Sequence, residues 1–273
     1  MLKILVCVKQ IPDVDLVKMD PETGNLIRTG VPTLTNPLDL NALEAAVQVK
    51  EKYGGEITLI TMGPPMAEST LRECLAVGGD EAVLISGRPF GGADTLSTSY
   101  SIVMAATMKG KFDLIFCGKE SLDGATGQMA SQLAERFDAS QISCCFSIDE
   151  IADGKVRATR TLETGKEIVE ATLPCLITVE KDNFYGRLPN LEAYLASKAA
   201  GITVYSENDI DGLDLQKIGI PGSGTIVPKI YPPELPEPGQ IISTGSVKTD
   251  VCRLVEVLSE KGTLKGGPED AEI

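Results

Sequence analysis

The segment with the clearest chemical potential is a glycine-rich turn, Gly118-Lys-Glu-Ser-Leu-Asp-Gly-Ala-Thr-Gly-Gln128, which follows an apolar run and opens a helical pattern. Beyond the carboxyl end of a strand in an open parallel sheet, such a turn aims helix amides at a phosphate. Its internal glycines would let the backbone approach an anion closely, and Thr126 and Gln128 offer polar side chains. The alternative is an ordinary strand-to-helix turn in which Asp123 caps the helix; Asp123 could also bind a ribose hydroxyl.

A second glycine-rich turn, Gly91-Gly-Ala-Asp-Thr-Leu-Ser-Thr-Ser-Tyr100, also runs into a helical pattern. Thr95, Thr98 and Ser99 are spaced i, i+3, i+4, so their hydroxyls share one helical face that could contact a cofactor's phosphate, ribityl chain or ring edge. On spacing alone, the favoured interpretation is that Asp94 or Thr95 is an N-cap and the hydroxyls face solvent.

Two shorter features lie near the first predicted strand. Asn36-Pro-Leu-Asp39 is typical of a capping turn, although Asn36 could read an adenine edge. Lys9 could contact phosphate, but a surface lysine is the favoured interpretation. Because the chain has neither G-x-G-x-x-G after this strand nor a Walker A sequence, any nucleotide must be held in another way.

Composition excludes several classes of function. There is no histidine, which rules out imidazole bases, His-bearing nucleophile triads and metal sites with His ligands. The formal charge of -14 disfavours nucleic acid and anionic membrane surfaces as partners. The seven cysteines form no Cys-x-x-Cys pair and mostly lie in apolar runs, so we expect reduced core thiols and no metal site.

The opening LKILVCV is too short for a signal-peptide core, and nowhere do 18 apolar residues run together. These observations predict a cytoplasmic protein that does not bind membranes.

Predicted strands and predicted helices alternate in the first half of the chain, and they must position these turns. This alternation predicts an α/β fold with a doubly wound, mostly parallel sheet. The predicted strands are Lys3–Val8, Glu56–Met62, Glu81–Ser86, Asp113–Cys117 and Gln141–Ile148, and the predicted helices are Leu40–Tyr53, Ala67–Val77, Thr95–Lys109 and Thr126–Phe137.

After Ile151 the runs become short and closely spaced. Three of them are predicted to extend the sheet as antiparallel edge strands, followed by a helix: Lys155–Leu162, Glu167–Ala171, Cys175–Val179, and the helix Leu188–Ala199. We therefore expect a nucleotide-binding domain over residues 1–205, which includes a loop at 180–200.

Residues 206–273 are expected to form an extended Pro-rich arm and a C-terminal helix, Val247–Lys261. Such an arm is either a disordered linker or a segment that orders on another subunit. Its apolar content, including Ile218, Ile226 and Val227, favours the partner-bound interpretation.

Four motifs occur together in order: VCVKQIPD, NPLDLNALEAAVQVKE, MGPPMAESTLRECLAVGGDEAVL and DLIFCGKESLDGATGQ. With them the chain resembles the β subunit of electron transfer flavoproteins over nearly its full length. The resemblance implies a heterodimer with a flavin-carrying α subunit, on which the arm and C-terminal helix of residues 206–273 would pack. It also implies a sheet of the adenine-nucleotide-binding type, with a nucleotide or flavin at its carboxyl edge in residues 1–205. That nucleotide is AMP in simpler members and a second FAD in electron-bifurcating members.

Carried over to this chain, the family's nucleotide site implies no catalytic side chain and no metal. The implied cofactor-binding residues are Cys7, Asn36, Pro37, Leu38, Asp39, Met62, Gly118, Lys119, Glu120, Ser121, Leu122, Asp123, Gly124, Ala125, Thr126, Gly127, Gln128 and Met129. The GGADTLSTSY stretch is similar to one in the bifurcating branch, which adds Asp94, Thr95, Thr98 and Ser99 as flavin contacts and favours FAD over AMP.

The resemblance further implies that NADH gives hydride to the β-subunit flavin, or that hydride returns to NAD. One electron then passes through the α-subunit FAD to a dehydrogenase, and the other reaches ferredoxin or flavodoxin. The chain would thus be one subunit of an oxidoreductase and not a complete enzyme. Two alternatives remain: a non-bifurcating carrier with structural AMP, and a non-redox adenine-nucleotide-binding module.

The partner-recognition loop departs from the family pattern. Where the family usually reads NEPRY-x-x-LP followed by a lysine-rich stretch, this chain reads Asp182-Asn-Phe-Tyr-Gly-Arg-Leu-Pro-Asn190 and lacks the basic run. Leu188 matches the leucine that inserts into the partner dehydrogenase. The implied partner is therefore an acyl-CoA dehydrogenase or, given the changed loop, a flavin-dependent 2-hydroxyacid (lactate-type) dehydrogenase.

Overall fold

A computed structural model describes residues 1–13, 18–19, 26–27, 31–179, 183–228 and 238–264. The chain divides into two compact units, Met1–Ile230 and Tyr231–Ile273. The candidate site lies within the first unit.

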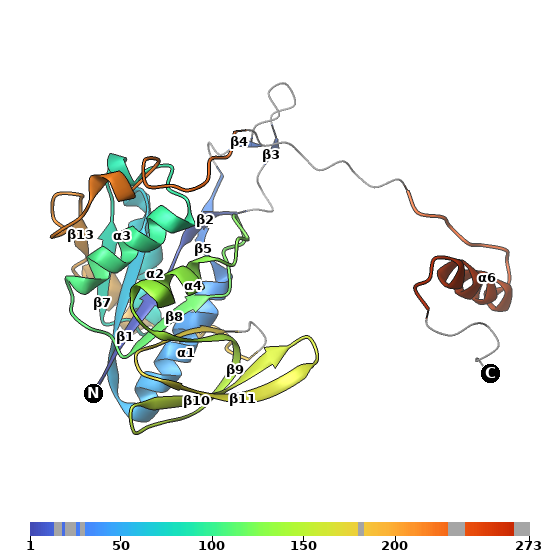
Figure 1. The fold of residues 1–273 in the computed structure, drawn as a ribbon, viewed down its shortest axis with the longest axis horizontal. Coiled ribbons are helices and arrows are strands. Elements are labelled where there is room, and N and C mark those ends of the chain that lie inside the picture. The colour runs from blue at the N-terminus through green and yellow to red at the C-terminus, as the bar shows by residue number, and fades with distance from the viewer. Residues whose placement is uncertain (14–17, 20–25, 28–30, 180–182, 229–237, 265–273) are drawn as a thin grey trace. The chain divides into compact units, whose positions relative to one another are not determined.

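The first unit has the predicted α/β fold (Figure 1). Its main sheet has nine strands among the described residues, in the order β11-β10-β9-β12-β8-β1-β6-β7-β13. The strands are β1 (Leu2–Cys7), β6 (Gly55–Met62), β7 (Glu81–Ile85), β8 (Leu114–Gly118), β9 (Ser140–Ala152), β10 (Lys155–Leu162), β11 (Gly165–Thr172), β12 (Cys175–Val179) and β13 (Thr203–Tyr205). Two small pairs accompany it, β2 (Gln10–Pro12) with β5 (Thr33–Thr35) and β3 (Lys18–Met19) with β4 (Leu26–Ile27).

Helices cover both faces of this sheet (Figure 1). The helices of this unit are α1 (Pro37–Tyr53), α2 (Glu68–Val77), α3 (Thr95–Thr107), α4 (Met129–Arg136) and α5 (Leu191–Ala199), with 3-10 turns at Pro65–Ala67, Arg88–Phe90 and Leu215–Lys217. Because side chains alternate along a strand, β1 sends Ile4 and Val6 to the core shared with α1 and α2. Leu5 and Cys7 enter the core shared with α3 and α4.

The order of the strands places between β1 and β8 the switch point at which open α/β sheets form a ligand crevice. From β1 the chain passes through α1 to β6 on one side, and it returns after α3 to β8 on the other side of β1. Both neighbours run parallel to β1. Ligands of open α/β sheets bind where the strand order reverses in this way, outside the carboxyl ends of the strands.

The prediction that Cys175–Val179 is an antiparallel edge strand is wrong. This strand, β12, lies inside the sheet and runs parallel to both β8 and β9. All five of its residues are buried, as expected for a strand covered on both faces. The prediction holds for β10 and β11, whose alternating exposure suits the antiparallel edge that they form.

The first unit extends beyond residue 205, where the sequence predicted its end. Ile210 and Ile218 are buried in the core on the α3 side, beyond β13, the parallel edge strand beside β7 that ends at Tyr205. Part of the predicted arm is therefore stabilised by burial against this chain itself. Ile226 and Val227 stay exposed, so the partner-bound interpretation rests on them.

The second unit contains α6 (Val247–Glu260), close to its predicted range. Val251 and Leu254 are exposed on this helix. No helix in the described parts of the chain is both long and apolar enough to cross a bilayer. Five of the seven cysteines are buried, in agreement with their prediction as core thiols.

Candidate nucleotide site

The residues predicted to bind a cofactor gather at the carboxyl ends of three neighbouring strands. Cys7 ends β1, Met62 ends β6, and Gly118 ends β8. Residues 36–39 form the start of α1, and residues 119–128 connect β8 to α4, with side chains that are exposed or partly exposed. Burial raises the pKa of the Cys7 thiol well above its ordinary value, so this thiol stays protonated and supplies no nucleophile.

Asp39 joins the ends of β1 and β8. Its two carboxylate oxygens accept hydrogen bonds from the backbone N–H groups of Lys9, at 2.9 Å, and Gly118, at 3.0 Å. Burial nonetheless raises the pKa of Asp39 to about 7, against the opposing effect of these hydrogen bonds. A Cβ on Gly118 would lie 2.5 Å from Asp39 Oδ1, so the close approach requires glycine at that position.

Asn36 fixes the next part of the turn. Its side-chain amide donates to the carbonyl of Glu120 at 2.9 Å and accepts from the N–H of Leu122 at 3.3 Å. The side chain is fully buried and makes no cap to α1, which begins at Pro37, three residues before its predicted start. Asn36 and Asp39 thus use the first turn of one helix to fix the backbone of the residue 118–122 segment.

Lys9 and Asp123 form an ion pair between the segments that follow β1 and β8. Lys9 Nζ lies 2.7 and 2.8 Å from the two carboxylate oxygens of Asp123 and 3.3 Å from Ser121 Oγ. Partial burial opposes ionisation, but these hydrogen bonds outweigh it and hold the pKa of Asp123 below its ordinary value. The pairing offsets the negative charge that would otherwise repel a phosphate at this turn.

The turn leaves the amino end of α4 uncovered. The helix begins at Met129 and not at the predicted Thr126, because Ala125 and Gly127 have positive φ angles of 47° and 62° that interrupt helical geometry. Gln128 is the N-cap and makes no side-chain cap, so the first amides of α4 have no intrahelical acceptor. A Cβ on Gly127 would meet nothing within 4 Å, so there is open space beside Gly127, two residues before the helix begins.

The second glycine-rich turn lies beside the first. Thr95 Oγ1, at the start of α3, donates to Gln128 Oε1 at 2.9 Å and accepts from Gln132 Nε2 at 3.2 Å. Ser99 is buried and accepts from Arg136 Nε at 3.0 Å, whereas Thr98 is partly exposed. The three hydroxyls therefore do not form one solvent-facing row.

Asp94 caps α3, as the spacing suggested, by accepting from the Ser97 N–H at 3.0 Å. Its other carboxylate oxygen accepts from the N–H and hydroxyl of Thr225, at 2.9 and 3.0 Å. Asp94 thus links the second turn to the segment that leads out of the first unit, a contact across 131 residues that no local pattern indicates.

These residues would suit an adenine nucleotide or the ADP portion of FAD. Uncapped helix amides, open space at Gly127 and a neutralised Asp123 suit a phosphate group. The described residues contain no group of three or more Cys, Asp or Glu side chains placed to hold a metal ion.

Sequence reasoning missed the contacts that hold the loop before α5. Arg187 pairs with Glu44 and Glu51 of α1, and Arg72 of α2 donates to the carbonyls of Ser197 and Lys198 at the end of α5. These partners are more than 120 residues apart in sequence, so no spacing pattern could reveal them. Leu188 lies in this loop, because α5 begins at Leu191 and not at Leu188 as predicted.

The chain is similar over most of its length to proteins of one family. Residues 23–209 match the family described as "Electron transfer flavoprotein domain". The chain is 41% identical over 261 residues to the caffeyl-CoA reductase-Etf complex subunit CarD of Acetobacterium woodii, covering 95% of this chain and 99% of that one. It is 40% identical over 261 residues to the electron transfer flavoprotein subunit beta of Thermoanaerobacterium thermosaccharolyticum, with the same coverage.

A third relative, protein FixA of Bradyrhizobium diazoefficiens, is 39% identical over 236 residues, which cover 84% of this chain and 82% of that one. The family match spans more than half of the chain, and the first two relatives align along nearly all of it. The chain therefore belongs to the electron transfer flavoprotein family, in which it is a β subunit.

Proposed function

We propose that this β subunit pairs with a flavin-carrying α subunit and binds FAD at the crevice between β1 and β8. In this proposal NADH is the hydride donor, or NAD the acceptor in reverse. The electrons leave separately, one toward ferredoxin or flavodoxin and one through the α-subunit FAD to a partner dehydrogenase. The bound FAD would supply the change from hydride to single-electron chemistry.

The observation that carries the proposal is the position of the uncapped end of α4 at the reversal of strand order. The amides of its first turn would bind the cofactor's phosphates, and Gly127 leaves them room. Lys9 would keep Asp123 neutralised, and Asn36 and Asp39 would hold the turn in place. None of these roles needs histidine.

FAD is favoured over AMP because a second turn adjoins the first. The Thr95–Gln128 hydrogen bond places the start of α3 next to the phosphate turn, so a ligand held by the turn has further polar groups beside it. AMP would make no use of these additional polar groups. The name of the Acetobacterium woodii relative, a subunit of a reductase-Etf complex, supports assembly with an α subunit and a reductase.

Cofactor release tests this assignment. We expect the purified heterodimer, denatured and analysed by chromatography and mass spectrometry, to release two FAD and no AMP for each pair of subunits. One FAD and one AMP would contradict electron bifurcation and leave an ordinary electron carrier. Isolation of a stable single chain with neither flavin would instead favour the non-redox nucleotide-binding module.

We also propose that Leu188 contacts the partner dehydrogenase, because 91% of its surface is exposed although it lies in a loop fixed on both sides. Replacing Leu188 with alanine is expected to lower electron delivery to the dehydrogenase about tenfold, as loss of an exposed apolar anchor does at many interfaces. Stopped-flow reduction by NADH should be unchanged.

Ile168→Ala on β11 is the matched control, since Ile168 is also a large apolar side chain that is 70% exposed. Equal loss of both activities in Leu188→Ala would show that the loop has a different role. An equal loss of delivery in the control would show that exposed apolar surface in general matters.

A further inference from the structure

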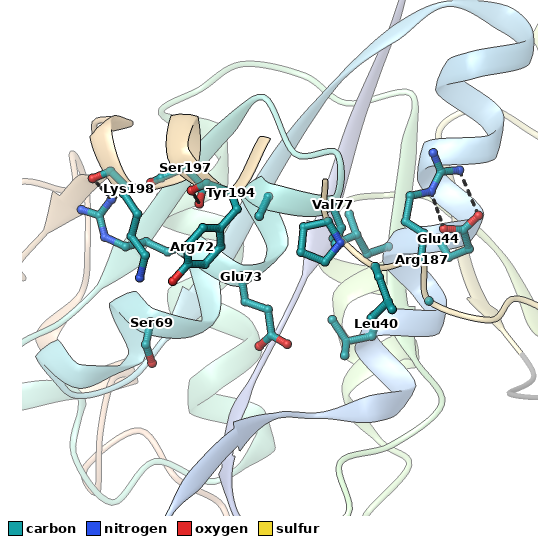
Figure 2. A pocket seen from close by; sticks show the side chains of 15 residues that line it. Leu40, Glu44, Ser69, Arg72, Glu73, Val77, Arg187, Tyr194, Ser197 and Lys198 are labelled. Carbon is teal, nitrogen blue, oxygen red and sulfur yellow. Dashed lines mark hydrogen bonds and ion pairs between the residues drawn. The ribbon is translucent and has the colours of Figure 1, made fainter. Parts of the chain in front are cut away.

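The loop that carries Leu188 lies beside a cavity of about 450 Å³ between α1, α2 and α5 (Figure 2). Leu40 of α1, Val77 of α2 and Tyr194 of α5 are among its lining residues. Pro189 and Leu188 form part of its rim and not of the buried core. The position of Leu188 is therefore set by the residues that flank it along the loop.

The segment before Leu188 is attached to α1 at successive points. The side chain of Phe184 is buried in the main core, and its carbonyl accepts from Asn41 Nδ2 at 2.5 Å. Gly186 passes close to Leu40, where an added Cβ would lie 3.6 Å from Leu40 Cβ. Glycine allows a wide range of backbone conformations, so these contacts do not by themselves fix the next residue.

Arg187 supplies the strongest attachment. Its guanidinium binds Glu44 through Nε at 2.8 Å and Nη2 at 3.0 Å, and it binds Glu51 through Nη1 at 2.5 Å and Nη2 at 3.1 Å. Both pairs are bidentate, the geometry in which arginine and carboxylate bind most strongly. These two ion pairs, with Glu44 and Glu51, form a clamp between Arg187 and α1. The Glu44 side chain is only 7% exposed, so this half of the clamp is largely shielded from solvent.

The other side of Leu188 is fixed independently. Asn190 caps α5 by accepting from the Ala193 N–H at 2.8 Å. Arg72 Nη1 donates to the Ser197 and Lys198 carbonyls at 2.7 and 3.0 Å, which holds the end of α5 against α2. Figure 2 shows Arg187 with Glu44 on one side of the cavity, and Arg72 with Ser197 and Lys198 on the other.

We propose that Arg187 is a positioning residue for docking: its clamp on α1 holds the loop so that Leu188 is presented to the partner dehydrogenase already ordered. The inference rests on the proposed docking role of Leu188. A loop that is ordered before association binds more tightly because ordering no longer has to occur on binding. Without the clamp, the loop would be held only up to Gly186 before Leu188 and from Asn190 onward after it.

Hydrogen exchange of the complete heterodimer tests the positioning itself. In Arg187→Ala, amides of residues 186–191 are expected to exchange about tenfold faster or more, since a local anchor has been lost. Peptides from β8 and α4 should be unchanged. Unchanged exchange in residues 186–191 would overturn the inference without reference to any partner.

Steady-state kinetics tests the consequence for docking, with an acyl-CoA dehydrogenase and a lactate-type dehydrogenase of the source organism as probes. Arg187→Ala should raise the KM for the dehydrogenase that accepts electrons about tenfold at nearly unchanged kcat, because association and not electron transfer has become costlier. Arg187→Lys should recover part of this loss, since lysine can pair with Glu44 but cannot form both bidentate contacts.

Two further variants separate positioning from general destabilisation. Arg187→Ala with Glu44→Gln removes the clamp without leaving a buried carboxylate unpaired, so it should keep the melting temperature near wild type and still raise KM. Arg160→Ala removes an arginine that pairs with Glu167 on the β10–β11 hairpin and should leave KM unchanged.

Failures of the two proposals can be told apart. If Leu188→Ala leaves KM unchanged while Arg187→Ala speeds exchange, the docking role of Leu188 is wrong, and the inference falls with it. If Leu188→Ala raises KM but Arg187→Ala does not, Leu188 docks and Arg187 does not position it. A lower kcat at unchanged KM in Arg187→Ala would also contradict the positioning role.

Discussion

Replacing Gly127 with leucine is expected to remove nearly all bound nucleotide from the β subunit. The position lies before the uncapped end of α4, and its Cβ would project into space that is open in the protein. Because that space is where a phosphate would reach the helix amides, a leucine side chain there would block the approach. The measurement is the amount of FAD or AMP released per heterodimer after denaturation.

Gly154→Leu is the matched control for this experiment. Gly154 has a φ of 73°, close to the 62° of Gly127, and an added Cβ there also meets nothing within 4 Å. Both substitutions should cost about 1–2 kcal/mol of stability through left-handed backbone strain. If Gly127→Leu keeps its full nucleotide content, residues 118–129 do not form the binding site. If both variants lose nucleotide, the loss is due to lower stability and not to a blocked site.

Replacing Asp39 with alanine should destabilise the protein by about 2–4 kcal/mol, because each buried N–H left without an acceptor costs about 1–3 kcal/mol. The two N–H groups are those of Lys9 and Gly118, at the ends of neighbouring strands. Denaturant titration followed by circular dichroism measures the change. Nucleotide content should also fall, since Gly118 begins the phosphate turn.

Asp209→Ala is the control for Asp39→Ala. Asp209 also accepts two hydrogen bonds, from the N–H and hydroxyl of Ser206, but the acceptor is exposed to solvent. Water can replace such a bond, so the expected loss is below about 1 kcal/mol. Similar losses in the two variants would show that burial of Asp39 contributes little.

The pH dependence of Asp39→Asn gives a second measurement at the same position. Because burial raises the pKa of Asp39 to about 7, the folded protein holds this proton more tightly than the unfolded chain between about pH 4 and pH 7. In that window the unfolded chain loses the proton while the folded protein keeps it, so the stability of the wild type falls as the pH rises. The free energy of unfolding of the wild type minus that of Asp39→Asn should fall as pH rises; a rising difference would mean that the hydrogen bonds outweigh burial.

Sequence reasoning located most elements because their patterns were local. The apolar runs of β1, β6, β7 and β8 gave the parallel core, and the glycine-rich turn after β8 lies where a switch-point site belongs. Alternation also identified the β10–β11 hairpin as an antiparallel edge. The start of α4 was predicted three residues too early, because a left-handed Ala125 carries no compositional signal.

The remaining features depend on contacts between distant parts of the chain. The position of β12 inside the sheet follows from pairing with β8 and β9, and an isolated apolar run is compatible with either orientation. Asp94 was a plausible cap from its spacing, but its bonds to Thr225 required the folded chain. The same holds for Lys9, whose partner Asp123 is 114 residues away.

Helix α1 contacts both the phosphate turn of the candidate site and the loop that carries Leu188, so it fixes the position of one relative to the other. Asp39 in its first turn fixes the phosphate turn, and Glu44 and Glu51 hold the loop that carries Leu188. A helix advances 1.5 Å and turns 100° per residue, so one residue inserted between positions 39 and 44 would rotate one set of contacts away from the other. Deletions and insertions in this five-residue interval should therefore be far more damaging than similar changes in the β10–β11 turn.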